Sequence, residues 1–351
     1  MTNELTLPPF AITAVGSFPH PEGLRLSRRL AESLDIPSWP QLSRRSFREN
    51  MYIQYSASLP AVRVDEEAEK ITFDTTGDLS QPLEEFYTHY LAEDLEAFAL
   101  TPEYAAGFFD MLAALKDTPG EWVKGQVTGP ISVGLTVTDQ DLRASLYNEL
   151  LADALVKNAA MNARWQIQKL REIRPNVVIS VDEPYMAAFG SAFISLERHQ
   201  VITMLDEVFE AIHQEGALAS VHCCANTDWS VLLATTVDIL NLDAYGYLEN
   251  LALYPVELRR FLDRGGSVLW GIVPNNDDIY HTTPEALANQ LREGQQLIQT
   301  KAQARGVDIS TGELAERSLI TTSCGLGLAT IEIAERALDI LVQTGDLLKQ
   351  G

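Results

Sequence analysis

Short apolar runs recur along the chain, and each is followed by a stretch in which apolar residues have helical spacing. Runs of four to eight β-branched and aliphatic residues between turn signals are typical of buried parallel strands. We predict eight such strands, near residues 10–15, 71–74, 122–127, 177–181, 217–221, 237–242, 267–273 and 319–322. Alternation of strands with helices indicates a parallel sheet. Eight repeats without an evident linker predict a single α/β domain over residues 1–351, a closed (β/α)8 TIM barrel.

Two stretches depart from this regular pattern. Residues 37–60 are irregular and rich in proline and arginine, which predicts an insertion after the first strand–helix unit. A long stretch of helical spacing ends near residue 173, and either Asp139 or Asp141 could cap its start.

Polar residues gather where the predicted strands end. In a (β/α)8 barrel the carboxyl ends of the strands form the face on which active sites are built. The residues at these positions are Ser17, Thr128, Asp182, Glu183, His222, Cys224, Asp243 and Cys324. We therefore expect side chains scattered over the whole sequence to meet at one mouth.

Three of these residues suggest a metal site. Side chains alternate along a strand, so His222 and Cys224 point the same way while Cys223 points the opposite way. Cys324 follows another strand and precedes a glycine-containing turn. Imidazole and thiolate ligands together favour zinc over hard cations, and three protein ligands leave a fourth position for substrate. The competing interpretation is that the cysteines are small buried hydrophobic residues.

Three carboxylates lie beside these candidates. Asp243 ends the strand after that of His222, and it is either a fourth zinc ligand or a group that orients His222 or caps a loop. Asp182 and Glu183 are both candidate substrate-binding residues, but they are neighbours in sequence, so only one of them can point into the mouth. The other is expected to pack against the wall.

The amino-acid composition disfavours several classes of function. The chain is 46% hydrophobic and carries a formal net charge of −23, which disfavours binding to nucleic acid or an anionic membrane surface. Three cysteines cannot all pair. The first residues lack the features of an export signal, and no apolar run approaches the ~20 residues of a membrane span. We expect a soluble, cytoplasmic protein.

An arginine cluster interrupts this acidic composition. Arg44, Arg45 and Arg48 lie within five positions. They could bind a carboxylate or phosphate of a ligand. Equally, they could pair with the acidic residues of the protein itself.

Five motifs together resemble the catalytic domain of cobalamin-independent methionine synthase, over almost the whole chain. They are Val15-Gly16-Ser17-Phe18-Pro19, Thr128-Gly129-Pro130, Val181-Asp182-Glu183-Pro184, His222-x-Cys224 and Ser323-Cys324-Gly325-Leu326. The resemblance implies a (β/α)8 barrel, a catalytic zinc, and transfer of a methyl group to the sulfur of homocysteine, a step of methionine biosynthesis.

The resemblance also assigns roles to residues. His222, Cys224 and Cys324 match the zinc ligands of the family. Gly16, Ser17 and Asp182 match segments that hold the carboxylate and amine of the amino acid, and Asp182 is the candidate catalytic carboxylate. The family has a glutamate ligand where Asp243 stands here. Its glutamate for the homocysteine amine has no clear match, and neither does its N-terminal barrel, which helps to hold folate.

The methyl donor stays open. The segment from His222 to Thr227 also resembles corrinoid-dependent methyltransferases of the uroporphyrinogen decarboxylase superfamily. Methyltetrahydrofolate and a methylcorrinoid protein are both candidate donors, and the acceptor could be a thiol other than homocysteine. Two further alternatives are metal-free decarboxylation of an acidic tetrapyrrole held by the arginine cluster, and a carrier that binds metal or corrinoid without catalysis.

Overall fold

A curled parallel sheet forms the centre of the molecule. The computed structural model describes residues 5–191 and 194–350. The main sheet has the strand order β1-β10-β9-β8-β7-β6-β4, and every neighbouring pair is parallel. Its strands are β1 (Ala11–Ile12), β4 (Trp122–Thr128), β6 (Asn176–Asp182), β7 (Leu218–Cys223), β8 (Ile239–Leu242), β9 (Ser267–Val273) and β10 (Ser318–Thr322). Sequential strands lie side by side, as expected for strand–helix repeats.

The predicted closed eight-stranded barrel is wrong. The sheet has seven strands and is open, because its edge strands β1 and β4 are not paired with each other. Between them, the segment after the first helix makes isolated bridges, from Ile36 to Thr13, from Ser38 to Lys124 and from Gln41 to Ser17.

The expected second strand, at residues 71–74, belongs to a separate small sheet. There β3 (Lys70–Phe73) pairs with antiparallel β2 (Val62–Asp65) and with parallel β5 (Thr138–Asp139). The β2 strand alternates between half-buried and exposed positions, which is the pattern of a surface hairpin. A run of four residues such as 70–73 does not by itself distinguish a hairpin strand from a strand of the main sheet.

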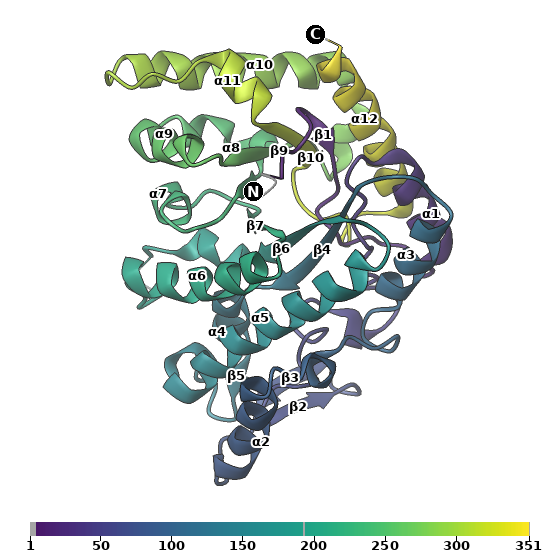
Figure 1. The fold of residues 1–351 in the computed structure, drawn as a ribbon, viewed down its shortest axis with the longest axis vertical. Helices are drawn as coiled ribbons and strands as arrows, with labels where there is room; N and C mark the ends of the chain where they lie inside the picture. The colour runs from purple at the N-terminus through teal and green to yellow at the C-terminus, as the bar shows by residue number, and fades with distance from the viewer. Residues whose placement is uncertain (1–4, 192–193, 351) are drawn as a thin grey trace.

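Helices cover the outer face of the main sheet (Figure 1). In the view of that figure, α6, α7, α8, α9 and α10 stack along one side, while α1, α3 and α12 lie on the other, and the small sheet with α2 lies at one end. The helices are α1 (Leu24–Ser33), α2 (Ser80–Leu91), α3 (Ala106–Lys116), α4 (Pro130–Thr136), α5 (Glu149–Arg171), α6 (Arg198–Gln214), α7 (Trp229–Leu233), α8 (Ala244–Leu251), α9 (Pro255–Asp263), α10 (Pro284–Gln303), α11 (Thr311–Glu316) and α12 (Ile331–Lys349). Short 3-10 turns occupy Phe47–Glu49, Leu95–Phe98, Ser145–Tyr147, Pro184–Ala188 and Asp277–Tyr280.

The long helix α5 starts later than the sequence suggested. Asn148 caps it, accepting hydrogen bonds from the backbone N–H groups of Leu150 and Leu151. Asp139, one of the two expected caps, instead lies in β5 and accepts from the backbone N–H groups of Asp141 and Arg143. Asn and Asp both favour such local acceptor roles, so side-chain type alone did not identify the cap.

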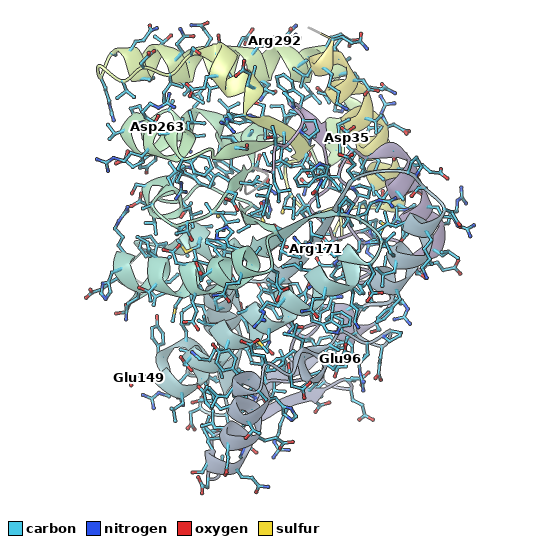
Figure 2. All side chains as sticks on the ribbon, viewed as in Figure 1. Asp35, Glu96, Glu149, Arg171, Asp263 and Arg292 are labelled. Carbon is cyan, nitrogen blue, oxygen red and sulfur yellow. The ribbon has the colours of Figure 1, made fainter. Side chains whose placement is uncertain are left out.

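The two faces of the main sheet bury different residues. One face joins the helices in a large apolar core, to which Ile179, Val181 and Val221 contribute. The concave face has a separate small cluster at the amino ends of the strands, formed by Ala11, Ile36, Trp122, Val178, Ile239, Leu269 and Leu319. The six charged residues labelled in Figure 2 are exposed: Asp35, Glu96, Glu149, Arg171, Asp263 and Arg292. The concave face therefore has an apolar floor beneath its carboxyl-end mouth.

Candidate metal centre

Strand register brings the predicted residues to one place. Thr128 at the end of β4 pairs with Asp182 at the end of β6, and Asp182 pairs with His222 on β7. Paired residues of a parallel sheet present their side chains on the same face. Cys324 arrives from the other half of the sheet, just after β10, where an irregularity in register between Thr321 and Thr322 redirects the chain.

His222, Cys224 and Cys324 form a compact group. One ligand atom from each lies within 4.8 Å of the others. His222 is 2% exposed, and neither of its ring nitrogens makes a hydrogen bond of good geometry with the described residues. A buried imidazole without such a partner is costly unless something else satisfies it. The donor set of one imidazole and two sulfurs fits zinc, so the residues pass the chemical test for that metal.

The two thiols of the group differ in acidity. The hydrogen bond between them, together with His222, lowers the pKa of Cys324, while the same bond and burial raise the pKa of Cys224. Burial opposes a charge on His222, yet the interaction with the Cys324 sulfur, through a hydrogen bond and its charge, and the charge of Asp182 raise the pKa of His222. Cys324 is therefore the sulfur most readily deprotonated, and a divalent cation would release the proton of Cys224 as well.

Cys223 is not part of this group. It is fully buried in the large core, and its sulfur lies 3.5 Å from the carbonyl oxygen of Ala225. Burial raises the pKa of the Cys223 thiol to about 12. Adjacent cysteines of one segment thus have opposite roles, as the alternation of side chains predicts.

Asp243 lies beside the group without joining it. Its carboxylate accepts a hydrogen bond of 2.8 Å from the backbone N–H of Gly246 and caps α8. Burial raises the pKa of Asp243, and the charge of Cys324 adds to this effect while that of His222 opposes it. The described geometry matches the capping role of Asp243, and since only one of its carboxylate oxygens accepts from Gly246, the ligand role stays a prediction.

Asp182 is the carboxylate that belongs to the concave face. It is 5% exposed and accepts a hydrogen bond of 2.8 Å from the hydroxyl of Ser180. Burial raises its pKa, and the positive charges of Lys124 and His222 counteract that effect. The carboxylate retains acceptor capacity beyond the single bond from Ser180, so it can receive an additional donor.

Glu183 does not face the mouth, and of the two orientations expected for Asp182 and Glu183 it has the one that packs against the wall. Its fully buried carboxylate accepts hydrogen bonds from the backbone N–H groups of Ile131 and Ser132, and from the hydroxyl of Ser132. Burial raises the pKa of Glu183 to about 7, although these three donors act in the opposite direction. A Cβ at Gly129 would lie 2.1 Å from this carboxylate, which explains the glycine of the Thr128-Gly129-Pro130 motif.

Gly16 and Ser17 support the loop that carries Cys324. The carbonyl of Ser17 accepts from the backbone N–H of Leu326 at 2.9 Å, and its hydroxyl accepts from that of Gly327 at 3.4 Å. A Cβ at Gly325 would lie 2.1 Å from the Ser17 hydroxyl oxygen. Gly16 has a φ of +142°, a conformation that favours glycine. These contacts show how the two motifs interlock, whereas the predicted grip on a substrate carboxylate stays a prediction.

Sequence reasoning missed a buried lysine. Lys124 on β4 is 1% exposed, and its amine donates a hydrogen bond of 2.7 Å to the carbonyl of Val15. Burial lowers the pKa of Lys124 to about 8, with the charge of Asp182 opposing the shift. The signal was available in the strand itself, where polar residues alternate at Lys124, Gln126 and Thr128 within an otherwise buried run.

The three arginines of the cluster pair with other groups of the protein itself. Arg44 donates to the backbone carbonyls of Gly327, Leu328 and Ala329. Arg45 pairs with the buried Glu49 at 2.6 Å. Arg48 pairs with Glu66 and Glu103. Of the two roles considered for the cluster, the geometry matches internal pairing.

Comparisons with known proteins identify no family. No family model and no curated protein matches the chain. Among solved structures, it is similar to 3-keto-D-glucoside 4-epimerase, YcjR, from E. coli in its apo form, with 14% sequence identity and a TM-score of 0.37. That match covers 68% of this chain and 85% of the epimerase chain. None of the helices in residues 5–191 and 194–350 is long and apolar enough to cross a membrane.

Proposed function

We propose that this protein is a zinc-dependent methyltransferase that methylates a thiol, with homocysteine as the acceptor. The observation that carries the proposal is the His222, Cys224 and Cys324 group at the carboxyl ends of a parallel sheet. Ligand sites in open α/β sheets lie at that end of the strands. The motif resemblance to methionine synthase supplies the substrate.

The ligands define the chemistry. When bound, zinc would hold the substrate thiol as a thiolate, which is the nucleophilic form of a sulfur whose pKa is otherwise near 8.5. The substrate sulfur forms a bond to the donor methyl carbon, the bond from that carbon to the donor breaks, and the donor keeps the electron pair. The thiol proton passes to solvent.

Residues of the chain would orient the acceptor. The Asp182 carboxylate accepts hydrogen bonds only, and a substrate ammonium would supply both a donor and a compensating charge. The positive charges of Lys124 and His222 help to keep Asp182 ionised despite its burial. Ser17 and the neighbouring backbone would receive the substrate carboxylate. Asp182, Lys124 and His222 are buried, which strengthens their electrostatic effects.

The arrangement of the arginines does not support the main enzymatic alternative, decarboxylation of an acidic tetrapyrrole. Decarboxylation of an acidic tetrapyrrole required free arginines, yet Arg44, Arg45 and Arg48 are all engaged by protein groups. The carrier alternative also binds metal, so the assay must distinguish it by turnover.

The test is transfer of an isotope-labelled methyl group. Zinc-loaded protein is incubated with homocysteine and either labelled methyltetrahydrofolate or labelled methylcobalamin, and labelled methionine is measured. We expect turnover with one donor, loss of turnover in Cys324→Ser, and retained turnover in Cys223→Ala. A zinc-loaded protein that methylates neither homocysteine nor any other thiol with either donor would contradict the proposal and favour a carrier.

A further inference from the structure

A layer of buried polar side chains lies between the metal group and the apolar floor. The members on strands sit two residues before the mouth and therefore share the concave face. Ser180 precedes Asp182, Ser220 precedes His222, and Asn241 precedes Asp243 on β6, β7 and β8. The further members of this polar layer are Thr321 on β10 and Ser38 beside β4. All of them are fully buried.

Most of the polar layer lacks hydrogen-bond partners. Among the described residues, no group pairs with the hydroxyls of Ser38, Ser220 and Thr321. Asn241 is the most pronounced case, because both its amide nitrogen and its amide oxygen are unpaired. Buried polar groups are nearly always hydrogen-bonded, and ordered water commonly provides the missing partner. Four such side chains on one concave surface therefore point to a bound ligand rather than to four unrelated defects.

The unpaired groups adjoin a metal ligand. Asn241 on β8 is the register partner of His222 on β7, so the amide and the imidazole lie side by side on the same face. The ring nitrogens of His222 likewise make no hydrogen bond of good geometry within residues 5–191 and 194–350, although Cys324 lies close enough to interact with one of them. A metal-ligating histidine usually donates its second ring N–H to a carboxylate, a carbonyl or a water, which fixes the ring orientation. Two side chains are in register with His222 and could complete such a link, Asp182 on β6 and Asn241 on β8. Of the two, Asn241 is the one whose polar atoms have no hydrogen-bond partner among the described residues.

We propose that the polar layer is a water-binding site and that Asn241 acts through this water as a positioning residue for His222. Water suits the site because the amide and the hydroxyls offer both donors and acceptors and carry no net charge. Gly271 on β9 places no side chain over the layer, and a Cβ there would lie 2.7 Å from the carbonyl oxygen of Leu242. The positioning role rests on the proposed zinc function, whereas the water site does not.

The first test compares zinc affinity in two variants. Asn241→Leu keeps the approximate size of the side chain and removes its polar groups. Thr344→Val is the matched control, because Thr344 on α12 is equally buried and has an unpaired hydroxyl away from the metal group. Chelator competition is expected to show zinc binding about 10- to 100-fold weaker in Asn241→Leu, and unchanged in Thr344→Val. Equal affinity of Asn241→Leu and wild type would overturn the positioning role.

Cobalt substitution separates positioning from a general loss of stability. A change in imidazole orientation alters the visible absorption of bound Co²⁺, whereas a merely less stable protein with the same ligand geometry keeps the wild-type spectrum. We expect an altered spectrum for Asn241→Leu and a wild-type spectrum for Thr344→Val. An unaltered spectrum in both variants would overturn the positioning role.

The second test needs no variant. A high-resolution crystal structure of wild-type protein, with or without zinc, should show ordered water within about 2.7–3.2 Å of the Asn241 amide. A dry layer would overturn the water site. Failure of wild-type protein to bind zinc would overturn the proposed function and the positioning role together, and the crystal structure would still decide the water site.

Discussion

The metal group and the arginine cluster are both concentrations of reactive side chains, and the protein uses them in opposite ways. His222, Cys224 and Cys324 come from segments about a hundred residues apart and meet within 4.8 Å. Arg44, Arg45 and Arg48 are close in sequence, yet each is engaged with a different part of the protein. Proximity in sequence therefore did not produce a site, whereas equivalent positions on distant strands did.

The difference has a physical cause. Parallel strands must end at the same edge of the sheet, so residues at their carboxyl ends converge whatever their separation in sequence. Long arginine side chains on an irregular segment instead reach the nearest carbonyls and carboxylates, where each gains charge-assisted hydrogen bonds. The metal group leaves donor atoms available for a ligand, whereas the arginine cluster forms hydrogen bonds and ion pairs that hold loops of the protein together.

The largest expected effect is on metal content. Cys324→Ser should reduce zinc from about one ion per chain to almost none, because a serine hydroxyl stays protonated at neutral pH and is a poor zinc ligand. Elemental analysis after purification under reducing conditions measures the zinc content per chain. Cys223→Ala is the control and should keep its zinc, since Cys223 faces the core. Full zinc in Cys324→Ser would contradict the role of Cys324 as a ligand. Loss of zinc in Cys223→Ala would contradict the placement of Cys223 outside the metal group.

The next effect is a pH dependence that comes from Glu183. Its folded pKa of about 7 is raised above the usual 4.5, so its protonated form stabilises the fold below pH about 4.5, and this contribution is lost as the pH rises through about 7. Glu183→Gln cannot ionise. The free energy of unfolding of wild type minus that of Glu183→Gln should therefore fall between pH 5 and 7.5, by at most about 3 kcal/mol. Urea denaturation at the two pH values measures the change, and a constant difference would show that Glu183 does not titrate there.

A smaller effect should distinguish members of the arginine cluster. Arg45→Ala leaves the buried Glu49 without its ion-pair partner and should cost about 1–3 kcal/mol of unfolding free energy. Arg48→Ala is the matched control, because it removes pairs with the exposed Glu66 and Glu103 and should cost about 0–1 kcal/mol. Denaturant unfolding measures both costs. Zinc content should be normal in each variant, and a loss of zinc in either would place the cluster in the metal site.

The sequence predicted the positions of the strand ends better than the closure of the sheet. Buried runs such as 177–181 and 267–273 lie in β6 and β9 because long apolar stretches have no other stable place. The run at 71–74 was wrongly counted with them, since its short β-branched pattern also suits the hairpin that it forms with β2. Local patterns identify strands, and pairing depends on neighbours that the pattern does not contain.

The same distinction applies to the candidate site. Cys224 and Cys324 could be found from the sequence because thiols are few and stand at strand ends. Alternation predicted that Asp182 and Glu183 would face opposite ways, but the choice depended on donors from α4. Lys124 and Asn241 escaped notice, because a polar residue in a buried strand becomes meaningful only when its neighbours across the sheet are known.

X-ray absorption at the zinc edge, on protein purified under reducing conditions and measured with and without homocysteine, tests the central claim most directly. We predict about one zinc per chain, bound by the imidazole of His222 and the sulfurs of Cys224 and Cys324, with one additional sulfur ligand when homocysteine is added. Zinc whose sulfur coordination does not change would contradict homocysteine as the acceptor. Protein without zinc would contradict the metal centre itself.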